Sequence, residues 1–305
     1  FMRNEADLSK GTDLNAFAPR FSHAYGDLRR LPTVLVENHS LKPYRQRVLG
    51  TYVLLEATLK ALASDGAGLK SAIASDRASR PKVIAANWKE KADPVHWLDF
   101  PTIEGAEADA PVMGGKTMRW TGKPGPVVKI PVYGSEPGLQ LNVPKAYWVP
   151  STKPDVIARL KAHGIAVETI TASREVDVDM IRLAGFKTSN PAEGRTPVST
   201  TGVSHQTKTI TFPAGSVRVS TDQPLGALAT YLLEPESEDS FFAWGFFSEI
   251  LQRVEYMEPY AIEPMAEQML KDDPTLKAEF EKRLKDDAGF AASPLRRLMF
   301  FYERS

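Results

Sequence analysis

The residues best placed to do chemistry are a polar cluster, Glu37, Asn38 and His39, which directly follows the apolar stretch "LPTVLV". A carboxylate at the end of a buried strand, with polar neighbours, can act as a general base on a water molecule. The alternative is a structural ion pair between Glu37 and Arg45 or Arg47, which follow at a helix start. Spacing alone favours the ion pair and leaves the catalytic interpretation open.

Basic side chains lie on both sides of this cluster. They are Arg29, Arg30, Lys42, Arg45 and Arg47. Guanidinium groups bind carboxylates through a fork of N–H donors, so this set is able to hold an anion near Glu37. A solvated helix start has the same composition, so both interpretations stay open here as well.

The histidine spacing gives little support to a metal site. Zinc hydrolases usually place two ligands three or four residues apart on one element, and the nearest pattern here is His96 with Asp99. The chain has no cysteine, which excludes thiolate ligands and disulfides. His163 is expected in the last turn of a helix, where positive charge is favourable, and we interpret it as part of that helix end. The sequence by itself offers no recognisable metal site.

The elements that must position the polar cluster are a strand and a long helix. The β-branched run at residues 33–38 predicts a buried strand of the kind found inside α/β sheets. A helix is predicted after the Lys-Pro pair that follows, and Gly66 and Gly68 are expected to end it. Its buried stripe is expected to consist of Val48, Tyr52, Leu55, Leu59 and Leu62. Functional residues of α/β proteins lie at the carboxyl ends of strands, which is where the cluster stands.

The rest of the chain divides into two further zones. The predicted domains are residues 1–81, the C-terminal segment of an α/β domain; residues 82–222, a β-rich, sandwich-like domain; and residues 223–305, a helical region. Short segments such as "PVVKIPVY", "TKTITF" and "SVRVST" are separated by Gly and Pro turns. One helix, residues 154–164, interrupts them, and Ser151 or Thr152 is expected to cap it.

Two features of the last zone predict its structure. The aromatic residues between Phe241 and Phe247 are expected to form core packing between domains rather than a membrane contact or a ligand cage. Asp273-Pro274 is a strong helix start.

The charge balance excludes some partners. The chain of 305 residues carries 38 basic and 38 acidic residues, so it has no net positive charge that would attract nucleic acid or an anionic membrane. It has no apolar run of about 18 residues, so no membrane span is predicted.

One stretch resembles a known family. "FSHAYGDLRRLPTVLVENHSLKPYRQRVLGTYVLLEATL", residues 21–59, resembles the end of the catalytic domain in zinc carboxypeptidases of the M14 (carboxypeptidase A-like) family. The resemblance is to a bacterial branch in which Tyr-Gly-x-Leu-Arg precedes a strand ending in Glu, and His-Ser-Leu-Lys-Pro-Tyr begins the segment before a long helix. The later stretch "PAGSVRVSTDQPLGALATYLLEPESEDSFFAWGFF" looks like the C-terminal extension of that branch.

The resemblance implies a hydrolase that removes C-terminal amino acids from peptides. Glu37 would be its general base, and Tyr25 is a candidate residue of the substrate pocket. Zinc is the implied cofactor, although the family's ligands, a His-x-x-Glu pair and a later His, lie before this segment and are absent from the sequence. An alternative alignment would make His39 the third zinc ligand. Arg45 and Arg47 match none of the family's substrate-binding arginines.

Two hypotheses follow. The first is a C-terminal piece of a secreted or periplasmic metallocarboxypeptidase, whose missing N-terminal part would complete the catalytic domain; the activity of this chain by itself is then in doubt. The second is a non-catalytic module that lacks the zinc site and binds peptide or glycan on exposed tryptophans. Those residues are Trp88, Trp97, Trp120 and Trp148. A binding face of this kind needs two or more indoles side by side in solvent.

Overall fold

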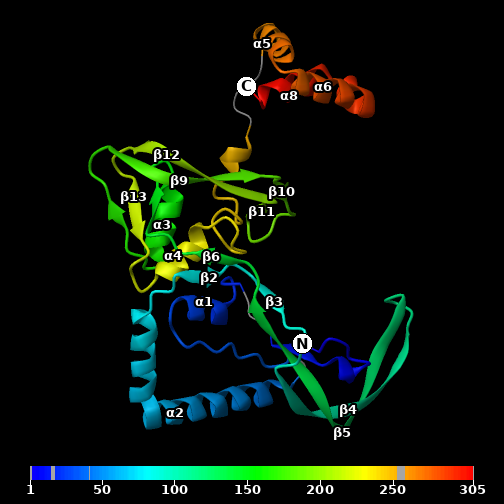
Figure 1. Cartoon of the computed structure of the whole chain (residues 1–305). Helices are drawn as coiled ribbons and strands as arrows, with labels where there is room; N and C mark the ends of the chain where they lie inside the picture. The colour runs from blue at the N-terminus through cyan, green and yellow to red at the C-terminus, as the bar shows by residue number, and fades with distance from the viewer. Residues whose placement is uncertain (1, 15–17, 41, 253–257, 305) are drawn as a thin grey trace. The chain divides into compact units, whose positions relative to one another are not determined.

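The chain folds into two compact units (Figure 1), Phe1–Ser248 and Glu249–Ser305. The computed structural model describes residues 2–14, 18–40, 42–252 and 258–304. Helices and several small sheets make up the first unit, and helices make up the second. This confirms the predicted fold class, an α/β chain with substantial β content and a helical C-terminal tail. The domain boundaries at 81 and 222 stay a prediction.

The first part of the chain contains little β structure. Its elements are η1 (Leu8–Lys10), β1 (Thr12–Leu14), α1 (Ser22–Leu28) and α2 (Tyr44–Ala78). The predicted strand at residues 33–38 is wrong: this segment forms no ladder with any described strand, and residues 31–37 are exposed. A strand needs a neighbour to accept its backbone hydrogen bonds, and the described residues provide none here.

Helix α2 begins as predicted but differs in two respects. Non-helical backbone angles at Asp65 interrupt it just before Gly66, yet the helix resumes and reaches Ala78. Its apolar stripe was predicted to be buried, and that prediction is wrong, because no residue of α2 is buried. Tyr52 is 64% exposed and Leu59 is 66% exposed. No sheet among the described residues covers this face.

The strands of the first unit form small sheets. They are β2 (Val83–Ala85), β3 (Trp88–Glu90), β4 (His96–Ala110), β5 (Gly115–Pro137), β6 (Gln140–Asn142), β7 (Ala146–Val149), β8 (Glu168–Thr169), β9 (Arg174–Ala184), β10 (Lys187–Thr188), β11 (Val198–Ser199), β12 (Gly202–Phe212) and β13 (Val217–Ser220). The β5 strand pairs with β1, β3 and β4, while β13 lies between β7 and β8. Two long antiparallel ribbons, β4–β5 and β9–β12, stand out (Figure 1).

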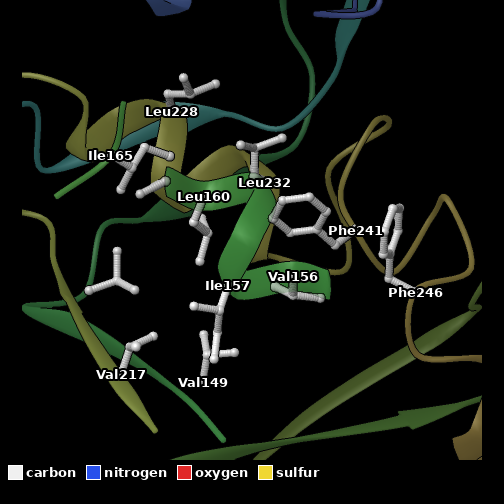
Figure 2. Packing of buried hydrophobic residues seen from close by; sticks show 12 residues of the cluster. Val149, Val156, Ile157, Leu160, Ile165, Val217, Leu228, Leu232, Phe241 and Phe246 are labelled. Carbon is white, nitrogen blue, oxygen red and sulfur yellow. The ribbon is translucent and has the colours of Figure 1, made fainter. Parts of the chain in front are cut away.

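The main core packs α3 (Pro154–Ala162) and α4 (Gly226–Leu233) against the β7–β13–β8 sheet (Figure 2). The buried side chains drawn there include Val156, Leu160, Val217 and Leu228, each without accessible surface. The predicted cap of α3 is wrong: Lys153 is the N-cap, and no side chain caps it.

The aromatic segment Phe241–Phe247 belongs to this core. Phe241, Phe242 and Phe246 are buried, and the Phe241 and Phe246 rings meet edge-on at 5.3 Å between centroids. This confirms core packing, and its place between two domains stays a prediction. The backbone makes turns rather than an α-helix here.

The second unit is a small helical cluster. Its helices are α5 (Pro259–Asp272), α6 (Pro274–Asp286), α7 (Ala288–Ala291) and α8 (Pro294–Tyr302), and the short η2 (Ser248–Leu251) precedes them. Phe280 contacts Phe290, Phe300 and Phe301, and these rings form the core. The predicted start of α6 is confirmed, because Asp273 accepts hydrogen bonds from the backbone N–H groups of Thr275 and Leu276. In the described part of the chain, no helix has both the length and the apolar character needed to cross a membrane.

Candidate functional site

Glu37 lies in the exposed extended segment between α1 and α2. Among the described residues, no cation lies within ion-pair distance of its carboxylate, so the ion pair with Arg45 or Arg47 is not formed. Instead, the Arg47 guanidinium donates from Nε to the Lys42 carbonyl at 3.1 Å. Glu37 is therefore an accessible carboxylate that no described cation neutralises.

Asn38 anchors the segment that carries Glu37. Its Nδ2 donates to Thr51 Oγ1 at 2.9 Å and to the Arg47 carbonyl at 3.4 Å. The Thr51 hydroxyl also donates to the Arg47 carbonyl, at 2.9 Å. This network fixes the residue next to Glu37 onto the first turns of α2. The sequence showed Asn38 as part of a polar cluster but not as the anchor of that cluster.

Tyr25 connects α1 to the main core. Its hydroxyl lies 2.7 Å from His163 Nδ1, and its ring packs against the buried cluster of α3 and α4. Arg29 Nη1 donates to the Tyr25 hydroxyl at 3.2 Å and to the His163 carbonyl at 2.8 Å. Tyr25 thus has a structural role in the described residues, and its role in a substrate pocket stays a prediction.

His163 forms the C-cap of α3, as its predicted position at a helix end requires. The expectation of a favourable positive charge there is wrong. Burial, followed by the charges of Arg29 and Arg159, lowers the pKa of His163. A neutral ring can accept the Tyr25 O–H at Nδ1, and protonation would remove that acceptor.

The proposed anion site beside Glu37 loses two of its arginines. Arg29 is bound at the Tyr25–His163 junction. Arg30 pairs through Nη1 with Asp76 of α2 at 2.7 Å. Both guanidinium groups therefore serve contacts of α1 with other elements.

The described residues do not fit a zinc site. They contain no group of three His, Asp or Glu side chains able to hold a metal ion. His39 is exposed in the segment before α2, and His96 is exposed on β4 opposite Val132. A structural zinc needs four ligands and a catalytic zinc three, so no step of a reaction can be assigned to a metal held by these residues.

A buried acidic segment after α4 was missed by the sequence reasoning. The Tyr147 hydroxyl donates to Glu234 Oε1 at 2.5 Å, and Glu234 is buried. Burial raises the pKa of Glu234, and the hydrogen bond from Tyr147 offsets part of that effect. Asp239, also buried, accepts the Trp244 indole N–H at 3.1 Å and pairs with Arg20. The acidic run directly after an apolar helix was the available signal.

The four tryptophans of the binding-module hypothesis do not form a cluster of neighbouring indoles among the described residues. Trp88, Trp97 and Trp120 are exposed, whereas the Trp148 ring packs on Phe212 at 5.2 Å. No two indoles are in ring contact within the described residues. Trp120 lies over Gly105 of the opposite strand, where an added Cβ would approach its ring to 2.6 Å. The arrangement needed for a glycan-stacking face is not present among these residues.

Comparison with known proteins gives a distant similarity to carboxypeptidases. Over 111 residues the chain is 30% identical to Carboxypeptidase 2 of Trichophyton rubrum, which covers 36% of this chain and 21% of that protein. Carboxypeptidase 2 of Trichophyton tonsurans and that of Trichophyton equinum are 30% identical over 107 residues, 35% of this chain and 20% of each relative. The chain thus spans about a fifth of the length of these relatives. No family model matches the chain. No solved structure matches it.

Proposed function

We propose that this chain belongs to a peptidase of the M14 carboxypeptidase type that releases C-terminal amino acids from peptides. The observation that carries the proposal is the 30% identity to Carboxypeptidase 2 over about a third of the chain. The segment at residues 21–59, with its bacterial-type pattern around Glu37, supports the same conclusion. In this proposal residues 1–81 belong to the catalytic domain, and residues 82–222 and 223–305 are accessory.

The uncovered apolar surface next to Glu37 also supports the proposal. Val34 is 81% exposed, and no residue of α2 is buried among the described residues. Exposed apolar surface of this extent is characteristic of an interface. We propose that residues 31–36 pair with, and α2 covers, the α/β sheet of a carboxypeptidase catalytic domain. The relatives are about five times longer than the matched segment, so they have ample chain for such a sheet.

Glu37 is the proposed general base. No described cation lies near its carboxylate. The next residue, Asn38, is hydrogen-bonded to the first turns of α2. A carboxylate so placed can take a proton from a water that attacks the scissile carbonyl and return it to the leaving amine. Zinc, the cofactor of the proposed family, would supply Lewis acidity. Its ligands have to lie outside the described residues, and we assign no step to it. Secretion or periplasmic location is part of the proposal.

The test is peptide hydrolysis by the protein as its gene encodes it. C-terminal amino acid release from a blocked dipeptide is measured for wild type, Glu37→Gln and Glu56→Gln. Glu56 is a matched control, because it is an exposed glutamate on α2 paired with Lys60 at 2.7 Å. Loss of a general base lowers the rate by about 10²-fold or more, so we expect this loss in Glu37→Gln only.

The zinc content of the same samples separates two kinds of failure. Full activity in Glu37→Gln would contradict the role of Glu37 while leaving a peptidase in place. Absence of hydrolysis in a wild-type protein that contains about one zinc per chain would contradict the peptidase proposal itself.

A further inference from the structure

The outer halves of β4 and β5 form a two-stranded arm, residues 103–124 (Figure 1). Among the described residues this arm pairs with no third strand, because β1 and β3 join β5 only between Val132 and Pro137. No residue at 103–109 or 115–124 is buried. A two-stranded hairpin is at best marginally stable in water. Both faces of the arm are therefore available to another surface.

The charges of the arm are divided by strand. Its β4 strand carries only acidic side chains, and its β5 strand carries only basic ones. They are Glu104, Glu107 and Asp109 on β4, and Lys116, Arg119 and Lys123 on β5. Within the described residues none of the six forms an ion pair. These charges remain available to a partner that carries the opposite pattern.

One face of the arm combines such charges with apolar surface. Directly opposite residues share a face of the ribbon, and so do residues two apart on one strand. The cross-strand pairs on this face are Gly105 with Trp120, Glu107 with Met118, and Asp109 with Lys116. Trp120 is exposed and lies over Gly105. At the tip of the arm Val112 and Met113 are also exposed. Aromatic and methionine side chains are enriched in protein interfaces.

The charge pattern makes this face complementary to a second copy of itself in one orientation. A two-fold rotation about an axis along the arm places β4 of one copy over β5 of the other, acid over base. A rotation about an axis across the arm places β4 over β4, and edge-to-edge pairing of two β4 strands also brings acid beside acid. Like charges placed together across an interface are strongly unfavourable. The first orientation also brings the two apolar tips together.

We propose that the arm is a dimerisation surface, which binds a second copy of this chain with the two arms parallel and face to face. Asp109 of each copy lies over Lys116 of the other, and the two Trp120 indoles fill the space between the ribbons. A two-fold interface of this kind is closed, whereas pairing of a β4 edge with a β5 edge would give open chains of copies. The arm lies within residues 82–222, and the proposal does not rest on the peptidase function.

The test is sedimentation velocity of the full chain at low salt, from about 1 µM to about 300 µM. A single arm forms a small interface, and small interfaces associate weakly. We therefore expect a reversible equilibrium between the monomer of 33.7 kDa and a dimer of twice that mass. Trp120→Ala should weaken dimerisation at least about tenfold, because buried aromatic side chains dominate interface affinity.

Two charge reversals give the decisive experiment. Asp109→Lys makes both facing positions basic, and Lys116→Asp makes both acidic, so each variant alone should dimerise at least about tenfold more weakly than wild type. An equimolar mixture of the two variants should dimerise again, because every facing pair then has opposite charges. Mixing cannot repair a hairpin weakened within one copy, so this rescue separates a contact between copies from the local stability of the arm.

The control is Leu59→Glu, which alters the exposed face of α2 and should dimerise as wild type does. A wild type that stays monomeric at about 300 µM, or one that forms species larger than a dimer, would overturn the proposal. So would arm variants that dimerise as wild type does, a mixture that stays monomeric, or loss of the dimer in Leu59→Glu. Peptide hydrolysis has no bearing on these results, so the two proposals fail separately.

Discussion

Two apolar regions of the first unit have similar composition but opposite environments. The core of α3, α4 and the β7–β13–β8 sheet is closed, and Leu228 in it has no accessible surface. Residues 31–36 and α2 carry as many large apolar side chains, yet Leu59 is 66% exposed. Both regions contain a helix that follows an extended segment. They differ in that the first has a sheet to cover and the second has none among the described residues.

The contrast shows that an apolar stripe marks a surface able to pack against another element, but it does not determine whether that element is present. An exposed helix of ordinary propensity gains little stability by itself, because most helical stability in proteins comes from packing. The region around Glu37 thus has apolar surface that the described residues leave uncovered. This is the physical basis for placing it against a catalytic sheet.

The same substitution, leucine to alanine, made once in each region should give the largest difference in the free energy of unfolding. Leu228→Ala removes a buried side chain and should lower the free energy of unfolding by about 2–5 kcal/mol. Leu59→Ala removes an exposed one and should change it by less than about 0.5 kcal/mol. Urea unfolding of this chain measures both. A large loss in Leu59→Ala would mean that the α2 stripe is covered in solution.

A matched pair of tyrosines gives an intermediate effect. Tyr147→Phe deprives the buried Glu234 of its hydrogen-bond donor and should cost about 1–3 kcal/mol. Tyr52→Phe, on the exposed face of α2, should be nearly neutral. The raised pKa of Glu234 means that the native state binds its proton more tightly, so stability should fall as pH rises above 4.5. The fall should be steeper in Tyr147→Phe, and an unchanged pH profile would argue against burial of Glu234.

The contact between Tyr25 of α1 and His163 at the edge of the core should give the smallest effect and a pH dependence of opposite sign. The pKa of His163 is lowered from 6.5, so the unfolded chain binds more protons near that pH. Its contribution to stability is present above 6.5 and is lost as pH falls below it. Thermal unfolding between about pH 8 and about pH 5 should show this loss as a difference between wild type and His163→Gln, because the opposing effect of Glu234 is common to both proteins. An equal dependence of stability on pH in the two proteins would show that His163 does not contribute to it.

Local signals in the sequence predicted much of the fold. The start of α2, the segment of β13 and the Asp273 cap follow from periodicity, turn residues and capping chemistry within a few positions, whereas β5 and β12 extend well beyond their predicted segments. Burial of residues 33–38 and of the α2 stripe was predicted wrongly. Period and composition report that a face is apolar, and they do not report whether a partner is present.

The contacts around the candidate site were beyond local reasoning. Tyr25 and His163 are 138 residues apart, and Tyr147 and Glu234 are 87 apart, so only the fold brings them together. The left-handed backbone conformation of Arg30, in the turn after α1, was also missed, because such a position usually belongs to glycine. Glu37 could be chosen from sequence because it ends an apolar run next to a recognisable pattern.

The most direct test of the contrast is amide hydrogen exchange of this chain. We expect the amides of α3, α4 and β13 to be strongly protected, and those of residues 31–36 and α2 to exchange far faster, because no packed surface stabilises them. Equal protection of the two regions would mean that the α2 face is already covered, and it would contradict the account that the region around Glu37 requires a catalytic sheet.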